Sequence, residues 1–532
     1  MSSANDAVAA QEELPGDPSA STAQAEWFGH PKGLYVLFFT EMWERFSYYG
    51  MRALLVLYMT KVLIIRADQG MVVFGYAGIR DGIQWLVNHL GMSGTLSVQA
   101  LSSQIYGLYT GFVYFTPFFG GILADRVFGQ RKSVYIGGVL MAIGHFLMAV
   151  QSMFFPALLF LILGNGCFKP NISTQISQLY PPGDPRRDRA FSIFYVGINT
   201  GAFLSPLVCG TLGQSLGWHF GFGAAGVGML LGLAGYIWSR RYVVFHPTPQ
   251  RTPVTHGRAV GAVALYLTTL PLGIGALLFL LTLPRIVPGL IGVAVAAAIV
   301  GWISRLPRDD RSRVVVLAVS CGVVTAFWSV YEQQGNTLQL WADVNTRWRF
   351  GSFTAPSTWF QAFNPFLIFL LTPVLTWLWG RQAARNGEPG SLTKMAIGAT
   401  LLGLGFVVMI AAAAGQPMDV KRSVGWLFAS TVVYTVGELY LSPIGLSFVT
   451  KVAPARMVAR LMGVWFFATA LGEFLAGQFA ALSDKIARGE VFHLLRGEAD
   501  FFLVLVVFPI VVAVALGVMT PWLKRRMHGR DV

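Results

Sequence analysis

The sequence predicts an all-α integral membrane protein, and three observations lead to this fold class. Of the 532 residues, 54% are hydrophobic and only 12% are charged, which is about half the charged share of soluble domains. Hydrophobic stretches recur along the whole chain, and each has the ~17–25 residues that a helix needs to cross a bilayer. Lysine and arginine gather in every second loop between these stretches, as is typical of multi-pass membrane proteins.

The N-terminal segment differs from the rest of the chain. Residues 1–30 are acidic, small and polar, and no lysine or arginine precedes Lys32. A secretory signal has a basic start followed by a hydrophobic core, so we do not expect one here. We expect instead a disordered tail on the cytoplasmic side of the membrane.

Fourteen hydrophobic stretches follow the tail, and each predicts one membrane-spanning helix. They lie near residues 33–60, 98–124, 133–152, 155–178, 190–215, 217–239, 259–282, 286–304, 314–336, 357–379, 393–414, 423–449, 458–483 and 500–523. The outer loop 63–97 between the first two spans is long enough to hold a short amphipathic helix, to which the sequence assigns no role.

The spans group into two halves around a central insert. The seventh and eighth spans carry almost no polar residues, so we expect them to face lipid, whereas the six spans on either side contain carboxylates and amides. The predicted parts are a tail, a six-helix bundle, a linker with two extra spans, a second six-helix bundle and a C-terminal tail. Their bounds are 1–30, 31–240, 241–312, 313–523 and 524–532.

The basic residues predict the orientation of the chain. Most of the 39 lysines and arginines lie in the loops after the even-numbered spans and in the C-terminal tail. Because positive residues accumulate in cytoplasmic loops, we expect both termini in the cytoplasm and the protein in the inner membrane. The net charge of +14 follows from these loops and forms no dense patch, so a nucleic-acid partner is not expected.

The first span contains a stripe of charge. Glu41, Glu44, Arg45, Tyr48 and Arg52 are spaced so that they share one face of a helix. Each charge at membrane depth costs about 2.5–3.5 kcal/mol on the mildest scale, so the stripe must face protein or water and have partners. Such a stripe indicates a transport pathway more often than a structural clamp, which is the alternative.

Two pairs of opposite charge match in depth between the halves. Lys169 and Glu438 lie ~21–23 Å from the outer surface, counted at the helical rise per residue. Arg52 and Glu332 match at a level nearer the outside. We interpret these pairs as two gating salt bridges that alternate access to a site between them. Static bridges that hold the halves together are the alternative.

Carboxylates outnumber bases among these intramembrane groups, and a carboxylate without a partner in a low-dielectric site favours its protonated form. This favours proton coupling, with Glu41 or Glu44 competing for Lys169. We expect Glu473, in the thirteenth span, to be a satisfied residue of a helix interface.

Polar side chains on the same helices suit a zwitterionic ligand. Arg45 and Lys169 would hold a carboxylate and Glu438 an ammonium group, although any single hydroxyl or amide more often serves helix packing. The further candidates for this pocket are Tyr48, Tyr49, Tyr106, Asn199, Glu332, Asn364, Ser442 and Trp465. The three cysteines lie in hydrophobic stretches, so neither a metal site nor a cofactor is expected.

These motifs resemble those of the proton-dependent oligopeptide transporter family within the major facilitator superfamily. The first span matches the family motif ExxERFxYYG from Glu41 to Gly50, and GNGCFKPNIS around Lys169 is similar to its fourth-helix motif. FYVGINTGAF, SVYEQQGNTL and GELYLSPIGLS carry Asn199, Glu332 and Glu438. GGILADRVFGQRK is similar to the superfamily signature between the second and third helices. The long loop before Tyr106 and the Gln-Gln after Glu332 depart from the commonest pattern.

The resemblance implies two six-helix bundles plus two inserted helices, as in bacterial members with 14 helices. It implies proton-coupled import of di- and tripeptides by a protein that we expect to act as a monomer in the bilayer. The peptide carboxylate would meet Arg45 and Lys169, and its amino group Asn199, Asn364 and Glu438.

Two other classes of protein are alternatives to a peptide transporter. One is a carrier of the same fold for another small solute, such as nitrate or an amino-acid-like or drug-like compound. The other is a membrane enzyme or a nutrient receptor. The sequence has neither a metal-ligand cluster nor a GxxxxGK[ST] phosphate loop, so we do not expect an enzyme.

Overall fold

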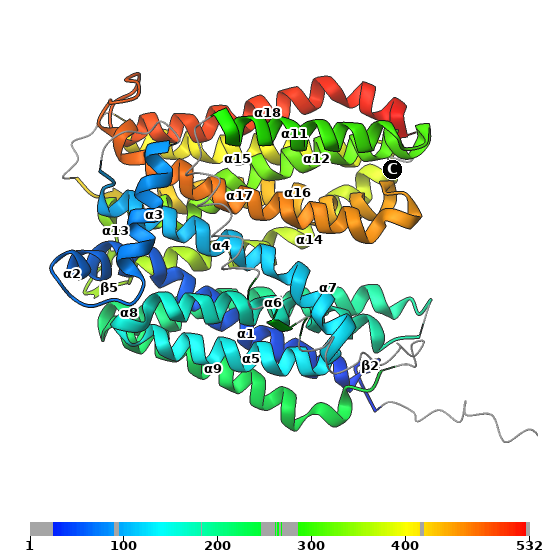
Figure 1. Ribbon diagram of the computed structural model, residues 1–532, viewed down its shortest axis with the longest axis horizontal. Coiled ribbons are helices and arrows are strands. Elements are labelled where there is room, and N and C mark those ends of the chain that lie inside the picture. The colour runs from blue at the N-terminus through cyan, green and yellow to red at the C-terminus, as the bar shows by residue number, and fades with distance from the viewer. Residues whose placement is uncertain are drawn as a thin grey trace, which may run out of the picture.

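The computed structural model describes residues 25–89, 95–181, 183–245, 286–414 and 420–527, together with Gly261, Val263, Ala264 and Thr268. Long helices that run along the longest axis of the molecule dominate it (Figure 1). Within the described residues, 11 helices are long and apolar enough to cross a membrane. Helices suit this environment because every backbone hydrogen bond is made inside the segment. The predicted all-α membrane fold is therefore confirmed.

The first group of helices makes up the N-terminal bundle. Three of its long helices continue through a π-helical turn, at Met59–Leu63, Ala124–Phe128 and Pro206–Gly210. Its helices are α1 (Lys32–Tyr58), α2 (Ile64–Asp68), α3 (Tyr76–His89), α4 (Val98–Leu123), α5 (Gln130–Met148), α6 (Phe154–Gln178), α7 (Arg186–Ser205), α8 (Thr211–Ser215) and α9 (Trp218–Trp238). Short 3-10 turns lie at Gln151–Met153 and Arg240–Tyr242.

The second group makes up the C-terminal bundle, preceded by α11 (Ile286–Ser304). Its helices are α12 (Arg308–Tyr331), α13 (Thr337–Asn345), α14 (Phe363–Ala383), α15 (Ser391–Ala413), α16 (Val424–Val452), α17 (Val458–Ala487) and α18 (Glu498–Met527). Its 3-10 turns are η6 (Glu332–Gly335), η7 (Ser357–Ala362) and η8 (Ala455–Met457).

Six two-residue strands join the helix ends. An antiparallel hairpin precedes α1, a parallel pair links the segments before η7 and α16, and a second hairpin follows α13. The pairs are β1 (Glu26–Trp27) with β2 (His30–Pro31), β3 (Thr346–Arg347) with β6 (Arg422–Ser423), and β4 (Arg349–Phe350) with β5 (Phe353–Thr354).

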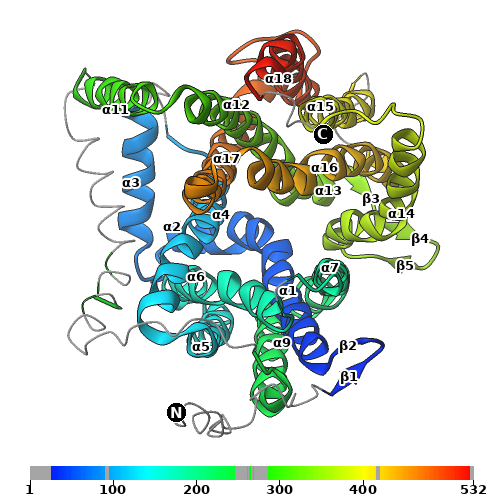
Figure 2. The ribbon, with the colours of Figure 1, turned by 90° about the vertical axis from the view of Figure 1, so that its right-hand side faces the viewer.

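Each bundle has its own hydrophobic core. One buried cluster is formed almost entirely by the N-terminal helices and another by the C-terminal helices, and Figure 2, a view along the longest axis, shows the two groups side by side. The bundles meet closely where α4 crosses α17. A Cβ added at Gly107 would lie 2.6 Å from the Cα of Gly477, so only glycine permits this approach.

Different elements lie at the two ends of the helical bundles. We call the end that holds β2 and the C-terminus the terminal end, and the end that holds α2, α13 and β5 the distal end (Figure 1). The helix α3 lies near the distal end (Figure 1) and runs across the direction of the long helices (Figure 2). It occupies the long outer loop that, from its length, could hold a short amphipathic helix.

Most predicted spans correspond to observed helices, with different limits. Beyond the 11 helices noted above, α5 and α11 lie at the predicted spans 133–152 and 286–304. The predicted span 259–282 falls outside the described residues except for Gly261, Val263, Ala264 and Thr268, and residues 1–24 and 528–532 of the two tails also fall outside them.

One predicted span, 314–336, lies within the membrane-crossing segment Arg308–Asn345 but is interrupted there. The stretch 314–336 is not one helix, because α12 begins at Arg308 and ends at Tyr331, where η6 interrupts it. The charged first turn was missed because hydrophobicity defined the prediction. Asp309 and Asp310 suit a helix N-terminus, where their charge interacts favourably with the helix dipole.

Candidate functional site

A cavity of about 350 Å³ lies between the two bundles, which is within the usual size range of small-ligand sites. Helices of both bundles line it, from α1, α4, α6 and α7 on one side to α12, α14, α16 and α17 on the other. Eleven of the residues predicted for the site line this cavity. They are Glu41, Arg45, Tyr49, Arg52, Lys169, Asn199, Glu332, Asn364, Glu438, Ser442 and Trp465.

Arg45 holds both carboxylates of its own helix. Its Nε lies 3.2 Å from Oε1 of Glu41, its Nη2 donates to Oε1 of Glu44 at 2.8 Å, and its Nε also contacts Glu44. Asn165 donates to Glu44 from α6 at 3.4 Å. All of these side chains are buried. The charge of Arg45 is therefore already balanced by two neighbours, while Oε2 of Glu41 has no hydrogen-bond partner in the described part of the chain.

Lys169 is a basic group of the cavity wall that forms no ion pair within the described part of the chain. Its Nζ lies 4.1 Å from the centroid of the Tyr114 ring, a cation–π contact that needs no anion. The structure gives Lys169 no ion pair with any described carboxylate, so neither Glu41 nor Glu44 reaches it. The lysine thus leaves a positive charge facing the cavity.

Glu438 is the corresponding acidic group on the opposite wall. It accepts hydrogen bonds from Oη of Tyr331 at 2.6 Å and from Nδ2 of Asn364 at 2.8 Å. Asn364 also contacts Thr435 at 3.0 Å. These neutral donors fix the carboxylate without cancelling its charge, and no described cation pairs with it. Lys169 and Glu438 do not form the predicted salt bridge in this conformation.

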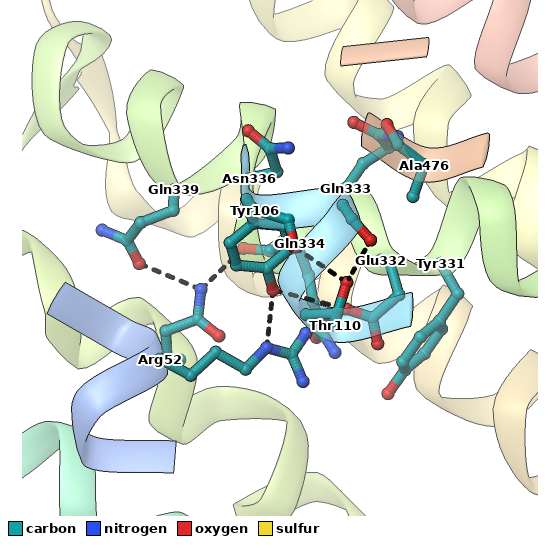
Figure 3. A network of polar contacts seen from close by, with 12 residues as sticks. Arg52, Tyr106, Thr110, Tyr331, Glu332, Gln333, Gln334, Asn336, Gln339 and Ala476 are labelled. Atoms are coloured by element: carbon teal, nitrogen blue, oxygen red, sulfur yellow. Dashed lines mark hydrogen bonds and ion pairs between the residues drawn. The ribbon is translucent and has the colours of Figure 1, made fainter. Parts of the chain in front are cut away.

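Arg52 and Glu332 form the predicted contact between the bundles. They make a buried ion pair, and Tyr106 of α4 joins them by accepting from Nε of Arg52 at 2.6 Å and donating to Glu332 at 3.4 Å. Figure 3 shows the three side chains converging. A Cβ at Gly335 would collide with the Tyr106 hydroxyl. The ion pair bounds the distal side of the cavity, where both charged residues line it.

The two glutamines after Glu332, which depart from the family pattern, stabilise η6. Gln333 donates to the backbone carbonyls of Ser329 at 3.0 Å and Ala476 at 2.9 Å. The carbonyl of Gln334 accepts from Gln361 at 2.6 Å. The carbonyls of Ser329 and Gln334 are backbone groups that the interrupted helix leaves free, while the bond to Ala476 ties η6 to α17 and helps to hold Glu332 in position (Figure 3).

A set of polar contacts between the bundles lies on the distal side of the cavity. We call this set the distal seal. It comprises Lys61–Asp343 at 2.5 Å, Ser97–Asp484 at 2.5 Å, Gln99–Ser483 at 3.0 Å, Gln104–Gln478 at 2.8 Å, Ser103–Asn336 at 2.8 Å, Gln214–Ser357 at 2.9 Å and Thr211–Trp359 at 2.9 Å. On the other side, the cavity wall extends toward the terminal end as far as Ser173 and Leu446.

Three predicted site residues lie outside the cavity wall. Tyr48 is buried with its ring 5.3 Å from the Arg45 guanidinium, Tyr106 serves the Arg52–Glu332 pair, and Glu44 lies behind Arg45. The helix periodicity placed them on the correct face, but neighbouring helices cover them. Asn199 does line the cavity, although its Nδ2 donates to the carbonyl of Tyr195 at 2.9 Å.

Aromatic and amide residues of the wall were missed by the sequence reasoning. Most of them are single polar or aromatic residues inside hydrophobic stretches, a pattern that gives no signal distinct from packing. Ser173, Tyr195, Tyr331 and Gln334 are the exceptions, because they lie within motifs that carry Lys169, Asn199 and Glu332. The missed lining residues include Tyr114, Ser173, Tyr195, Trp328, Tyr331, Gln334, Gln361 and Thr469.

The expectation for Glu473 needs correction. The residue does lie in a helix interface and is fully buried, but it is not satisfied. Within the described residues, neither of its carboxylate oxygens has a hydrogen-bond donor. Sequence patterns could not indicate this, because the hydrogen bonds of a buried carboxylate depend on donors from other helices.

Comparisons with known proteins agree with this architecture. Residues 131–494 match the model of the POT family. The chain is 36% identical to the peptide transporter YePEPT of Yersinia enterocolitica, over 85% of this chain and 88% of that one.

Solved structures are similar over nearly the full length. A crystal structure of a peptide transporter POT variant in complex with alafosfalin matches with a TM-score of 0.77 and 33% identity, covering 95% of this chain and 98% of that one. A POT family transporter in complex with 5-aminolevulinic acid matches with a TM-score of 0.74 and 28% identity, covering 94% and 98%. With its charged cavity between two helical bundles and this coverage, the chain belongs to the POT family of the major facilitator superfamily.

Proposed function

We propose that this protein is a proton-coupled symporter that imports di- and tripeptides across the inner membrane by alternating access. The observation that carries the proposal is the pair of opposite charges on facing walls of the cavity. Among the described residues, Lys169 on the N-terminal wall has no carboxylate partner and Glu438 on the C-terminal wall has no cation. A zwitterion with a carboxylate at one end and an ammonium at the other would satisfy both.

Polar side chains of the cavity wall explain why a peptide backbone suits this space. The amides Asn199, Asn364 and Gln334 line the cavity together with Tyr49 and Tyr195. Such groups can hydrogen bond to a peptide linkage whatever side chains flank it. The described function of the Yersinia relative, peptide transport, supports the same substrate class for this chain.

Alternating access would use the two bundles as moving parts, with bounds near residues 31–240 and 313–523. The distal seal and the Arg52–Glu332 pair cross between the bundles, whereas Lys169 and Glu438 remain apart. We infer that this conformation is closed at the distal end. With both termini in the cytoplasm, as the loop charges indicate, the distal end faces the outside.

Proton coupling would follow from competition for Arg45. A substrate carboxylate that approaches Arg45 and Lys169 would weaken the contacts of Arg45 with Glu41 and Glu44. A buried carboxylate that loses its cation binds a proton more readily. Peptide and proton would therefore bind together, and each would help to retain the other. One chain contains the whole cavity, so we propose a monomer as the transporting unit.

A carrier of amino-acid-like compounds is the second candidate. The structural relative bound to 5-aminolevulinic acid favours it, because that ligand also carries an amino group and a carboxylate. Nitrate is disfavoured by the negative charge of Glu438, which would repel an anion with no cationic end. Peptides and amino-acid-like compounds are both zwitterions. Experiments that compare the two kinds of compound must therefore distinguish the two candidate functions.

Uptake of radiolabelled dialanine into proteoliposomes with an acidic outside tests the proposal. We expect dialanine to accumulate above its external concentration and to leave when a protonophore collapses the gradient. Lys169→Ala and Glu438→Gln should each abolish accumulation, while empty liposomes serve as the background. Accumulation of 5-aminolevulinic acid without any of dialanine would favour the second candidate, and accumulation of neither would refute symport.

A further inference from the structure

Glu473 lies at the seam between the two bundles, and the function proposed above does not use it. Residues three and four apart share a face of a helix. The carbonyl of Ala476 accepts from Gln333 of η6 at 2.9 Å, and Gly477 packs on Gly107 of α4. Glu473 precedes these residues by three and four positions. Its side chain therefore enters the space between α4 of one bundle and η6 of the other.

The carboxyl group of Glu473 meets a second carboxyl in this space. Glu332 and the hydroxyl of Thr110 lie within hydrogen-bonding reach of it. Thr110 donates instead to the carbonyls of Tyr106 at 3.0 Å and Gly107 at 3.3 Å, and an ionised carboxylate of Glu332 has no hydrogen to donate. Within the described chain, neither oxygen of Glu473 therefore receives a hydrogen bond.

The described charges around Glu473 leave it without a cation of its own. The titratable groups that face it are Tyr48 and Arg52 of α1, Tyr106 and Tyr114 of α4, Lys169 of α6 and Glu332 of η6. Arg52 is bound to Glu332, and Lys169 lies over Tyr114. An ionised Glu473 would therefore be a buried charge without a counter-ion among the described residues, which is far less stable than the neutral acid. With one proton, the cluster of Arg52, Glu332 and Glu473 is neutral.

We propose that Glu473 is a proton-binding site at the bundle interface, and that the distal side closes only after Glu473 has taken up a proton from the water outside. The proton forms an O–H bond on Glu473, which can then donate to Glu332. This bond breaks when the seam reopens and water enters. The inference rests on the proposed function, because a seam that opens to the outside presupposes alternating access.

The size of the effect follows from acid–base equilibrium. In water, roughly one glutamic acid side chain in 500 is protonated at pH 7, and about one in six at pH 5. If only the protonated form permits closing, each unit of external pH changes the ratio of closed to open molecules by up to about tenfold. This pH dependence of distal closing is separate from the proton binding at Glu41 and Glu44 that would drive transport.

A distance measurement across the distal end tests the proposal. Leu216, after α8, and Val344, in α13, are 64% and 62% exposed and belong to opposite bundles. Nitroxide labels at Leu216→Cys and Val344→Cys, with Cys167, Cys209 and Cys321 replaced by alanine, would report closing by electron–electron resonance. We expect the short-distance population to fall as pH rises from about 5 to about 8, by up to about tenfold in ratio for each pH unit.

The variant Glu473→Gln supplies the decisive comparison, because it mimics the neutral acid. It should keep the distal side closed at every pH, whereas Glu438→Gln, the same change at a carboxyl held by Tyr331 and Asn364, should retain the pH dependence. Equal pH dependence in Glu473→Gln and the parent, or none in the parent, overturns the proposal. Should Glu473→Gln fail to fold, Glu473→Asp replaces it, and an unmoved pH midpoint overturns the proposal.

The outcomes separate this inference from the proposed function. If the parent protein accumulates dialanine with protons but closes independently of Glu473, only the proton site at Glu473 fails. If the parent accumulates no peptide, proton-coupled peptide transport fails instead, whatever the labels report.

Discussion

Arg52 of α1 and Glu332 of η6 form a buried ion pair that bridges the two bundles on the distal side of the cavity. Tyr106 of α4 holds the arginine in place at 2.6 Å. Because the two charges belong to different bundles, opening the distal side must break this pair. Arg52 and Glu332 therefore stabilise the conformation that is closed at the distal end, and breaking their ion pair can limit the rate at which that end opens.

Reversal of the charges at Arg52 and Glu332 tests the role of this pair. Arg52→Glu or Glu332→Arg alone leaves like charges buried together, and loss of one buried partner costs about 3–5 kcal/mol. We expect each single variant to lower dialanine uptake by at least about tenfold. The double variant should recover more uptake than either single one. Equal loss in all three, at equal amounts of folded protein, would exclude a gating pair.

The substitution Glu44→Gln tests proton coupling at Arg45. It keeps a hydrogen-bonding group beside the Arg45 guanidinium but removes the charge and the titration. We expect gradient-driven accumulation to be lost while exchange of internal for external dialanine continues. Asn165→Ala, which removes only the weaker contact with Glu44 at 3.4 Å, is the matched control and should still accumulate. Undiminished accumulation in Glu44→Gln would count against its coupling role.

Lys169 is expected to bind the substrate carboxylate. A hydrogen bond to a charged group contributes about 1.5–3 kcal/mol, so Lys169→Ala should weaken dialanine binding by about tenfold to a hundredfold. Dialanine amide, which lacks the carboxylate, should bind the parent protein poorly. Lys169→Ala should weaken the binding of the amide little further. Competition against labelled dialanine measures both ligands in both proteins. If the amide competes as well as the acid in the parent, Lys169 does not hold a carboxylate.

Close packing of α4 on α17 is expected to be necessary for distal closure. An alanine at Gly107 would place its Cβ 2.6 Å from Gly477, so the two helices must separate. We expect Gly107→Ala to reduce uptake strongly and to lengthen the distance between labels at positions 216 and 344. Gly235→Ala on α9, where nothing lies within 4 Å of the added Cβ, should behave as the parent. Normal uptake in Gly107→Ala would show that the seam tolerates expansion.

His30 is expected to make the N-terminal hairpin sensitive to pH. Burial, together with Arg186 and Arg189, lowers the pKa of His30 below its ordinary value of 6.5, and its Nδ1 lies 2.8 Å from Oη of Tyr180. When the hairpin is released, His30 returns to its ordinary pKa. The released form then binds more protons as pH falls below about 6.5, so acid destabilises the hairpin and higher pH restores it.

Hydrogen–deuterium exchange of residues 26–31 measures this effect. Exchange should quicken as pH is lowered from about 7.5 to about 5.5, after correction for the intrinsic rate, and His30→Gln should remove the dependence. A hairpin that is equally protected at both pH values would contradict the assignment.

The sequence predicted the parts of the site that a single helix determines. The stripe from Glu41 to Arg52 follows from helical periodicity, and the matching depths of Arg52 and Glu332 follow from counting residues along their spans. Both inferences need only local geometry. The fold class was equally accessible, because composition and span length are properties of the chain itself.

Features that depend on neighbouring helices were not predictable. Tyr48 and Tyr106 lie on the expected face but are covered by other helices, and Lys169 faces Tyr114 in place of a carboxylate. The break at η6 was missed because its backbone groups are satisfied by Gln361 and by contacts within the turn. Glu473 illustrates the same limit, since its lack of donors depends on α4 and η6.

Movement of protons with the peptide tests the central claim most directly. Proteoliposomes without any initial pH gradient, loaded with a fluorescent pH indicator, should acidify inside when dialanine is added outside. The acidification should be absent with dialanine amide and in Lys169→Ala. Entry of labelled dialanine without acidification would contradict proton-coupled transport through this cavity.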